Sequence, residues 1–153
     1  MRLEDLKFLS EEERIGRLKV IEEAKNWLDT PYHHYAKIKG VGVDCAMFLV
    51  GVYENVGLVE QADIGEYEQE WHLHRNEEKY LERIKQWLKP TDNPLPADIC
   101  LFKFGRTVSH SAILVNYPLV IHSYYQKGVC YDEIDNGKLA NRIHSYWTFW
   151  SKN

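Results

Sequence analysis

The stretch from Gly40 to Val50 reads GVGVDCAMFLV and constrains the fold of this chain more than any other stretch does. Its two glycines indicate a loop, and Asp44 is a plausible N-cap for an apolar helix over about 45–56 that is buried nearly all round. Cys45 therefore falls in the first turn, where free amide donors and the helix dipole favour a thiolate. The simplest interpretation is that Cys45 is a nucleophile. It then needs a base, a group that orients the base and an oxyanion site.

Helical patterns come first in the chain and strand patterns follow. Ser10 and Glu13 form a capping-box pattern that predicts a helix over about 11–29, ended by Thr30-Pro31. A second amphipathic pattern predicts a helix over about 77–88. After Pro96, five short β-prone runs with brief connectors predict antiparallel strands near 99–104, 111–115, 119–124, 129–131 and 143–150. This order predicts an α+β fold, in which N-terminal helices pack on a C-terminal antiparallel sheet of about five strands.

Length and composition indicate a single globular domain. The chain has 153 residues, of which 44% are hydrophobic and 27% are charged, with no repeat or linker pattern. We therefore expect one domain spanning residues 1–153. The net charge of -4 and the pI near 6.0 argue against nucleic acid as the main partner. No apolar run approaches the roughly 20 residues that a membrane span needs.

Cysteine usage and the start of the chain suggest a reducing compartment. Cys45, Cys100 and Cys130 are widely spaced and odd in number, which is not a disulfide framework, and no CxxC metal pair occurs. Acidic residues follow Met1 directly, where a signal peptide would need an apolar segment. We expect a chain that is cytoplasmic as synthesised and lacks a signal peptide, with Cys100 and Cys130 as structural residues.

Two of the seven histidines stand in a suggestive relation in the strand half of the chain. His110 follows Ser109 and opens the second predicted strand, and His122 lies within the third. Adjacent antiparallel strands can place the two rings side by side, so that His122 orients His110 as an asparagine or aspartate would. The pattern therefore predicts that the helix bearing Cys45 packs on this sheet with its N-terminus facing both histidines.

At these residues the chain resembles the NlpC-type cell-wall peptidases, which are papain-like cysteine hydrolases. The similarity runs from about residue 20 to 124, in the order of the family. Its parts are WLDTPY (27–32), DC followed by FLV (44–50), LPADICLF (95–102), SHSAIL (109–114) and VIHS (120–123). The chain departs from the family where Ala46-Met47 replaces Ser-Gly after the cysteine and where Ser111-Ala112 replaces Val-Gly.

The resemblance implies a papain-like fold and a set of site residues. It makes Cys45 the nucleophile, His110 the base that holds the thiolate as an ion pair, and His122 the residue that orients the base. The expected oxyanion and substrate-binding residues are Tyr32, Asp44, Ser109 and His33, the last as the member of the His33-His34 pair that lines the groove.

The resemblance also implies a substrate and a setting. Family members hydrolyse peptidoglycan stem peptides without a metal, so we expect a peptidoglycan peptide as substrate and no cofactor. The loop from Tyr32 to Gly42 looks most like a phage-associated subgroup, which suggests phage-tail or particle proteins as partners.

Three other interpretations stay open. A thiol acyltransferase or amidase can act on a lipid or a small amide with the same scaffold. A binding module, such as a structural tail component, can keep a vestigial site. A zinc protein would use His33, His34, His72, His74 and Cys45, although their spacing matches no compact ligand motif.

Overall fold

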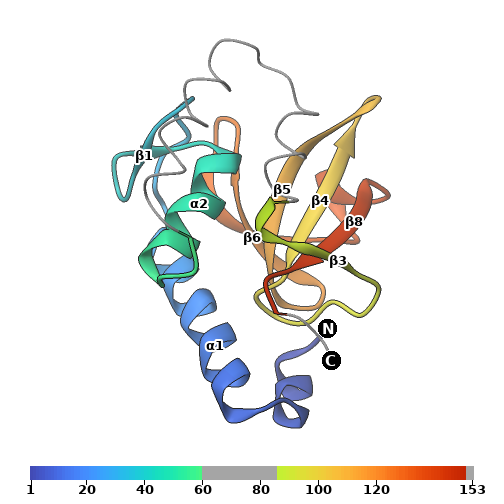
Figure 1. Cartoon of the computed structure of the whole chain (residues 1–153). Helices are drawn as coiled ribbons and strands as arrows, with labels where there is room; N and C mark the ends of the chain where they lie inside the picture. Colours follow the sequence, from blue (N-terminus) through green and yellow to red (C-terminus); the bar gives the residue numbers. More distant parts are fainter. Residues whose placement is uncertain (60–85, 151–153) are drawn as a thin grey trace.

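A computed structural model of the chain describes residues 1–59 and 86–150 (Figure 1). The elements in chain order are η1 (Leu3–Phe8), α1 (Glu11–Asn26), β1 (Lys37–Ile38), β2 (Gly42–Val43), α2 (Cys45–Asn55), β3 (Lys89–Thr91), β4 (Ile99–Phe104), β5 (Thr107–Asn116), β6 (Leu119–Tyr124), β7 (Gly128–Glu133), η2 (Gly137–Leu139) and β8 (Ile143–Thr148). This is the expected α+β architecture. The helix predicted over 77–88 falls largely outside the described residues.

Helix α1 begins where the capping box predicts and ends earlier than expected. The Ser10 hydroxyl accepts a hydrogen bond from the Glu13 N–H at 3.2 Å. The helix stops at Asn26 rather than near 29, because the chain turns sharply at Asp29, whose φ is 71°. The Asp29 N–H then donates to the Val129 carbonyl in β7 at 3.0 Å. The chain therefore leaves the helix to join the sheet before Pro31 is reached.

Six strands form the main sheet, in the order β3-β8-β4-β5-β6-β7, and every pairing is antiparallel. About five were expected, and the additional one is β3 at the edge. Its central residue is Pro90, which lacks an N–H and is tolerated at a sheet edge. Strand β5 is also longer than expected. It begins at Thr107, so His110 lies inside the strand rather than at its start.

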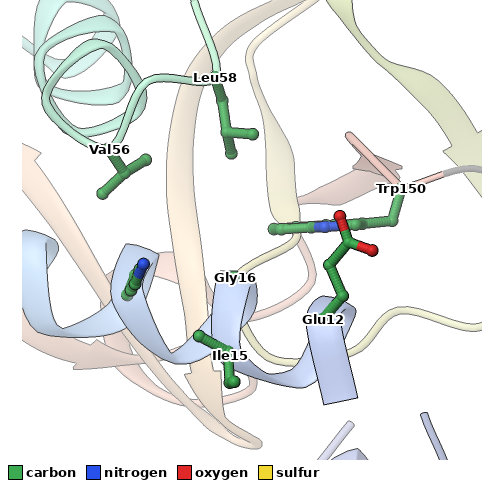
Figure 2. Close-up of a pocket in the computed structure, with 7 residues that line it drawn as sticks. Glu12, Ile15, Gly16, Val56, Leu58 and Trp150 are labelled. Atoms are coloured by element: carbon green, nitrogen blue, oxygen red, sulfur yellow. The ribbon is translucent and has the colours of Figure 1, made fainter. Parts of the chain in front are cut away.

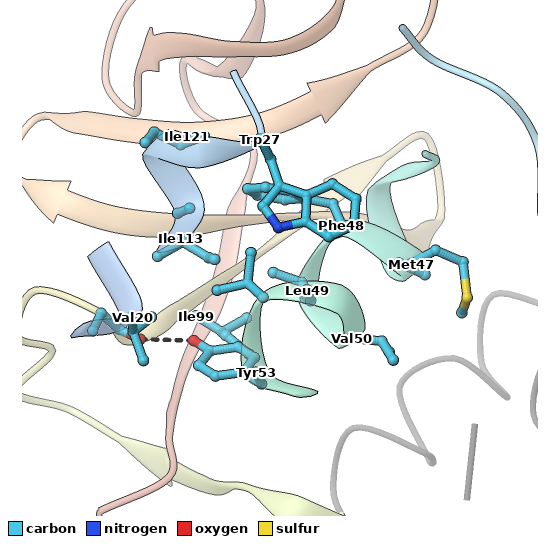
Figure 3. Packing of buried hydrophobic residues seen from close by; sticks show 14 of the residues in the cluster. Val20, Trp27, Met47, Phe48, Leu49, Val50, Tyr53, Ile99, Ile113 and Ile121 are labelled. Carbon is cyan, nitrogen blue, oxygen red and sulfur yellow. Dashed lines mark hydrogen bonds between the residues drawn. The ribbon is translucent and has the colours of Figure 1, made fainter. Parts of the chain in front are cut away.

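The helices cover one face of the sheet (Figure 1). The largest hydrophobic cluster joins α1 and α2 to inward residues of the strands, including Phe48, Ile113 and Ile121 (Figure 3). The Tyr53 hydroxyl donates to the Ala97 carbonyl at 2.7 Å, which satisfies its polar atom inside this core (Figure 3). The apolar pattern of α2 thus fixes the helix against the sheet.

The segment expected to be a loop over 31–44 contains a small hairpin. Strands β1 and β2 pair antiparallel, and Tyr32 forms a parallel bridge with Val43. The Val43 N–H donates to the Pro31 carbonyl at 3.0 Å. These backbone bonds tie Tyr32 to the residues directly before α2, and so hold it near Cys45.

Candidate active site

Cys45 is the first residue of α2 and lies beside strand β5. Asp44 caps the helix, because its carboxylate accepts from the Met47 N–H at 2.8 Å. The Cys45 Sγ lies 3.9 Å from the Ser109 carbonyl oxygen, and the Ser111 hydroxyl lies 3.4 Å from the Cys45 carbonyl oxygen. Cys45 therefore contacts the residues on either side of His110.

The two strand histidines lie ring to ring. His110 Nε2 is 2.7 Å from His122 Nδ1, and both side chains are buried. The register explains the contact. Ile113 pairs with Ile121, so continuing the pairing by one residue sets His122 opposite Ala112, with His110 on the neighbouring diagonal. Because Nε2 of His110 is occupied by His122, Nδ1 is the nitrogen of His110 that can serve the thiol.

Burial makes the neutral form of both rings favourable. Burial, with smaller contributions from His122 and Lys138, lowers the pKa of His110 to about 3. Burial also lowers the pKa of His122 to about 4, although the Asp132 carboxylate opposes the shift. The sequence leads us to expect a resting thiolate–imidazolium pair. Burial works against the imidazolium half of that pair, because it favours the neutral form of His110.

Tyr32 supplies a hydroxyl close to the thiol. Burial raises the pKa of Tyr32, and the negative charges of a Cys45 thiolate and of Asp44 raise it further. The hydroxyl therefore keeps its proton and can donate a hydrogen bond. Its ring packs edge-on against Tyr125, with centroids 5.5 Å apart.

A cleft of about 210 Å³ collects these side chains. The residues that line it are Tyr32, Cys45, Phe104, Ser109, His110, Ser123, Tyr124 and Tyr125. The predicted nucleophile and base thus share one cavity, and His122 lies directly behind the base. Sequence reasoning missed the aromatic residues 104, 124 and 125. Their signal was their position at the end of a predicted strand, for residues 104 and 124, or directly after it, for residue 125.

The remaining predicted site residues occupy different positions. Ser109 lines the cleft and offers its carbonyl to Cys45. Asp44 is buried and accepts from the N–H groups of Met47 and Tyr35, both at 2.8 Å, so it organises the loop. His33 is exposed and lies outside the set of residues that line the cleft; its Nδ1 is 3.1 Å from the His34 carbonyl oxygen. A role for His33 in binding substrate stays a prediction.

A second and larger hollow lies away from Cys45. It has a volume of about 360 Å³ and lies between α1, the residues just after α2 and Trp150 (Figure 2). Ile15, Val56 and Leu58 contribute apolar surface there, beside the carboxylate of Glu12. Its lining contains no cysteine or histidine, so it does not offer a nucleophile and base together.

Two further features bear on the sequence-based expectations. Within residues 1–59 and 86–150, no three histidine, cysteine or acidic side chains are grouped to hold a metal, and His72 and His74 lie outside these ranges. In the same part of the chain, no helix has the length and apolar character to cross a bilayer.

A cysteine at the start of a buried helix, facing histidines on an antiparallel sheet, is the arrangement of the papain-like α+β proteins. The chain belongs to the NlpC/P60 family, whose profile matches residues 29–148. The matched segment includes Tyr32, Cys45, His110 and His122. No curated protein gives a significant sequence match. These comparisons do not assign the phage-associated subgroup, which stays a prediction.

Solved structures share the fold at low sequence identity. A protein described as similar to lipoprotein, of the NLP/P60 family, from Staphylococcus aureus matches 94% of this chain at 14% identity, with a TM-score of 0.65. An NlpC/P60 family protein from Bacillus cereus matches 85% at 17% identity, with a TM-score of 0.61. This chain spans only 43% and 39% of those two proteins. The NlpC/p60 domain of the peptidoglycan hydrolase SagA matches 86% of this chain at 16% identity, with a TM-score of 0.59, and 97% of that domain is covered.

Proposed function

We propose that this protein is a cysteine peptidase that hydrolyses an amide bond in peptidoglycan stem peptides. The observation that carries the proposal is the shared cleft, in which Cys45 at the start of α2 meets His110 backed by His122. Membership in the NlpC/P60 family supports a cell-wall substrate, as does the fold shared with a domain of a peptidoglycan hydrolase.

The proposed reaction uses the thiol as nucleophile. His110 accepts the thiol proton on Nδ1 as Sγ of Cys45 attacks the scissile carbonyl carbon, and it then gives that proton to the leaving amine. The Cys45 backbone N–H and the Tyr32 hydroxyl donate to the oxyanion, and one such donor is typically worth about 3 kcal/mol of barrier. Water next attacks the thioester, with His110 as base, and releases the acid product and the thiol.

Digestion of defined muropeptides tests this function. Wild-type protein and Cys45→Ala are incubated with purified stem peptides, and the products are analysed by mass spectrometry. We expect fragments with a new free amine from wild type only. Cys100→Ala is the matched control, because Cys100 is a second free cysteine that lies outside the cleft lining.

The same experiment separates the other functions. Addition of a free amine acceptor distinguishes hydrolysis from acyl transfer, because a transferase forms a new amide with the acceptor. If wild type releases no fragment from any stem peptide, the peptidoglycan assignment is wrong. A cleft cysteine that also reacts no faster than a free thiol would indicate a structural module.

A further inference from the structure

The Asp132 carboxylate lies next to His122, on the side of that ring away from His110. Asp132 Oδ2 in β7 lies 3.3 Å from His122 Nε2, while His122 Nδ1 meets His110 at 2.7 Å. In the register of β6 and β7, His122 pairs with Cys130, so Asp132 lies one diagonal step along the same face. The three polar side chains thus come from three adjacent strands, and each ring nitrogen of His122 faces one of the other two side chains.

The contact between His122 and Asp132 is shielded from water. The His122 side chain is 0% exposed and that of Asp132 is 18% exposed. Within the part of the chain that the structure describes, neither His122 Nε2 nor Asp132 Oδ2 has a hydrogen-bond partner, so their 3.3 Å approach is a close polar contact and not an aligned hydrogen bond. A carboxylate can only accept, so a bare nitrogen facing it would set lone pair against lone pair. The buried contact is favourable when Nε2 of His122 carries the proton.

Two neighbours hold the Asp132 carboxylate in place. The Glu133 N–H donates to Oδ1 at 2.9 Å. The Lys138 ammonium lies 3.3 Å from Oδ2 and 4.5 Å from the centre of the Tyr124 ring. Together these contacts fix the direction in which Oδ2 points.

The position of the ring proton on His122 then determines the position of the ring proton on His110. If His122 is neutral with its proton on Nε2, its Nδ1 is an acceptor and receives the Nε2–H of His110. The Nδ1 of His110 is then bare and can take the thiol proton of Cys45. In the opposite tautomer, His122 would donate a hydrogen bond from its Nδ1 to Nε2 of His110. The proton of His110 would then be on Nδ1 of His110, and that nitrogen could not accept the thiol proton.

We propose that Asp132 is a positioning residue that selects the tautomers of His122 and His110 in which His110 can accept a proton from Cys45. The role of the base rests on the proposed function, whereas the tautomer selection does not. Sequence reasoning did not identify Asp132, because only the register of β6 and β7 brings it to His122.

Nitrogen NMR of the imidazole rings tests the tautomers without a substrate. In wild-type protein at pH 7 we expect both rings protonated on Nε2. In Asp132→Asn the amide can offer an N–H to His122 Nε2, so we expect a population with the proton on Nδ1. Glu133→Gln is the matched control, since it removes an equal charge from the adjacent, exposed position. A wild-type His122 protonated on Nδ1 would overturn the proposal, even if the variant fails to fold.

Kinetics on muropeptides provide a second readout. We expect Asp132→Asn to lower kcat about 10- to 100-fold with little change in KM, because it disturbs the base and not the cleft wall. We also expect its pH profile to change, and that of Glu133→Gln to match wild type. The titratable groups that face the histidine pair, and so enter this profile, are Cys45 on α2, Tyr32 before β1, Asp132 and Cys130 on β7, Lys138 on η2, Lys127 after β6, and Tyr124 on β6.

The two readouts separate this inference from the proposed function. If the tautomers depend on Asp132 but wild type cleaves no stem peptide, the positioning role holds and the assigned substrate is wrong. If Asp132→Asn keeps the wild-type tautomers and a kcat within twofold of Glu133→Gln, Asp132 has no positioning role, whatever the substrate.

Discussion

His110 Nε2 and His122 Nδ1 are 2.7 Å apart because two neighbouring strands hold the rings one diagonal step from each other. A side chain on a paired strand has little freedom to move along the sheet. The base of the proposed reaction is therefore oriented by backbone pairing before any substrate binds, which reduces the reorganisation that catalysis requires.

Alkylation of Cys45 measures its coupling to His110. With a neighbouring base, we expect iodoacetamide to label Cys45 at pH 6 at least about tenfold faster in wild type than in His110→Gln. Labelling is followed by mass spectrometry of the peptide that contains Cys45. His144→Gln serves as control, because His144 is exposed on β8. Equal rates in wild type and His110→Gln would show that His110 does not act on the thiol.

Stability should fall in acid because of the buried histidines. Burial lowers the pKa of His122 to about 4 in the folded state, whereas the unfolded chain titrates near 6.5. Between these pH values the unfolded chain binds more protons than the folded protein. The contribution of the ring to the free energy of unfolding is therefore fully present above about pH 6.5 and is lost as the pH falls towards 4. The expected slope is at most about 1.4 kcal/mol per pH unit for each such ring.

Urea unfolding at several pH values measures this slope. His122→Gln should show a shallower dependence on pH than wild type, whatever its absolute stability. His144→Gln, at an exposed position on β8, is the matched control. A His122→Gln protein with an unchanged slope would mean that His122 is not held neutral in the folded protein.

Tyr32→Phe removes one proposed oxyanion donor and leaves the ring in place. We expect kcat to fall about 100-fold, with KM and the melting temperature little changed, because the hydroxyl acts only when the oxyanion forms. Tyr131→Phe is the control on an exposed tyrosine outside the cleft. A kcat for Tyr32→Phe within twofold of wild type would assign the oxyanion site to other donors.

A buried ion pair joins α1 to the start of β4. Arg17 Nη1 lies 2.9 Å from Asp98 Oδ1, and the two side chains are 0% and 1% exposed. Arg17→Met leaves a buried carboxylate without its partner, and we expect a loss of about 3–5 kcal/mol in the free energy of unfolding. Lys25→Met breaks an exposed pair with Glu22 on the same helix and should cost less than about 1 kcal/mol. Similar losses of unfolding free energy in Arg17→Met and Lys25→Met would contradict the stabilising role given to the buried pair.

Local features were predictable because they depend on neighbours in sequence. Ser10 and Asp44 cap the helices that their positions predict, since a capping side chain reaches only the next few N–H groups. The change from helical to alternating apolar spacing after Pro96 predicts the sheet. The end of α1 was placed too late, because a long-range backbone bond from Asp29 to Val129 decides it.

The sequence by itself determined the class of fold, the helix start that presents Cys45, and two histidines on strands that had to be neighbours. Tertiary structure alone decided that β3 adds an edge strand, that aromatic side chains wall the cleft, and that Asp132 reaches the far nitrogen of His122. The physical reason is strand register. A shift of one residue turns every side chain of a strand to the other face, and that register is set by packing and pairing across the whole sheet.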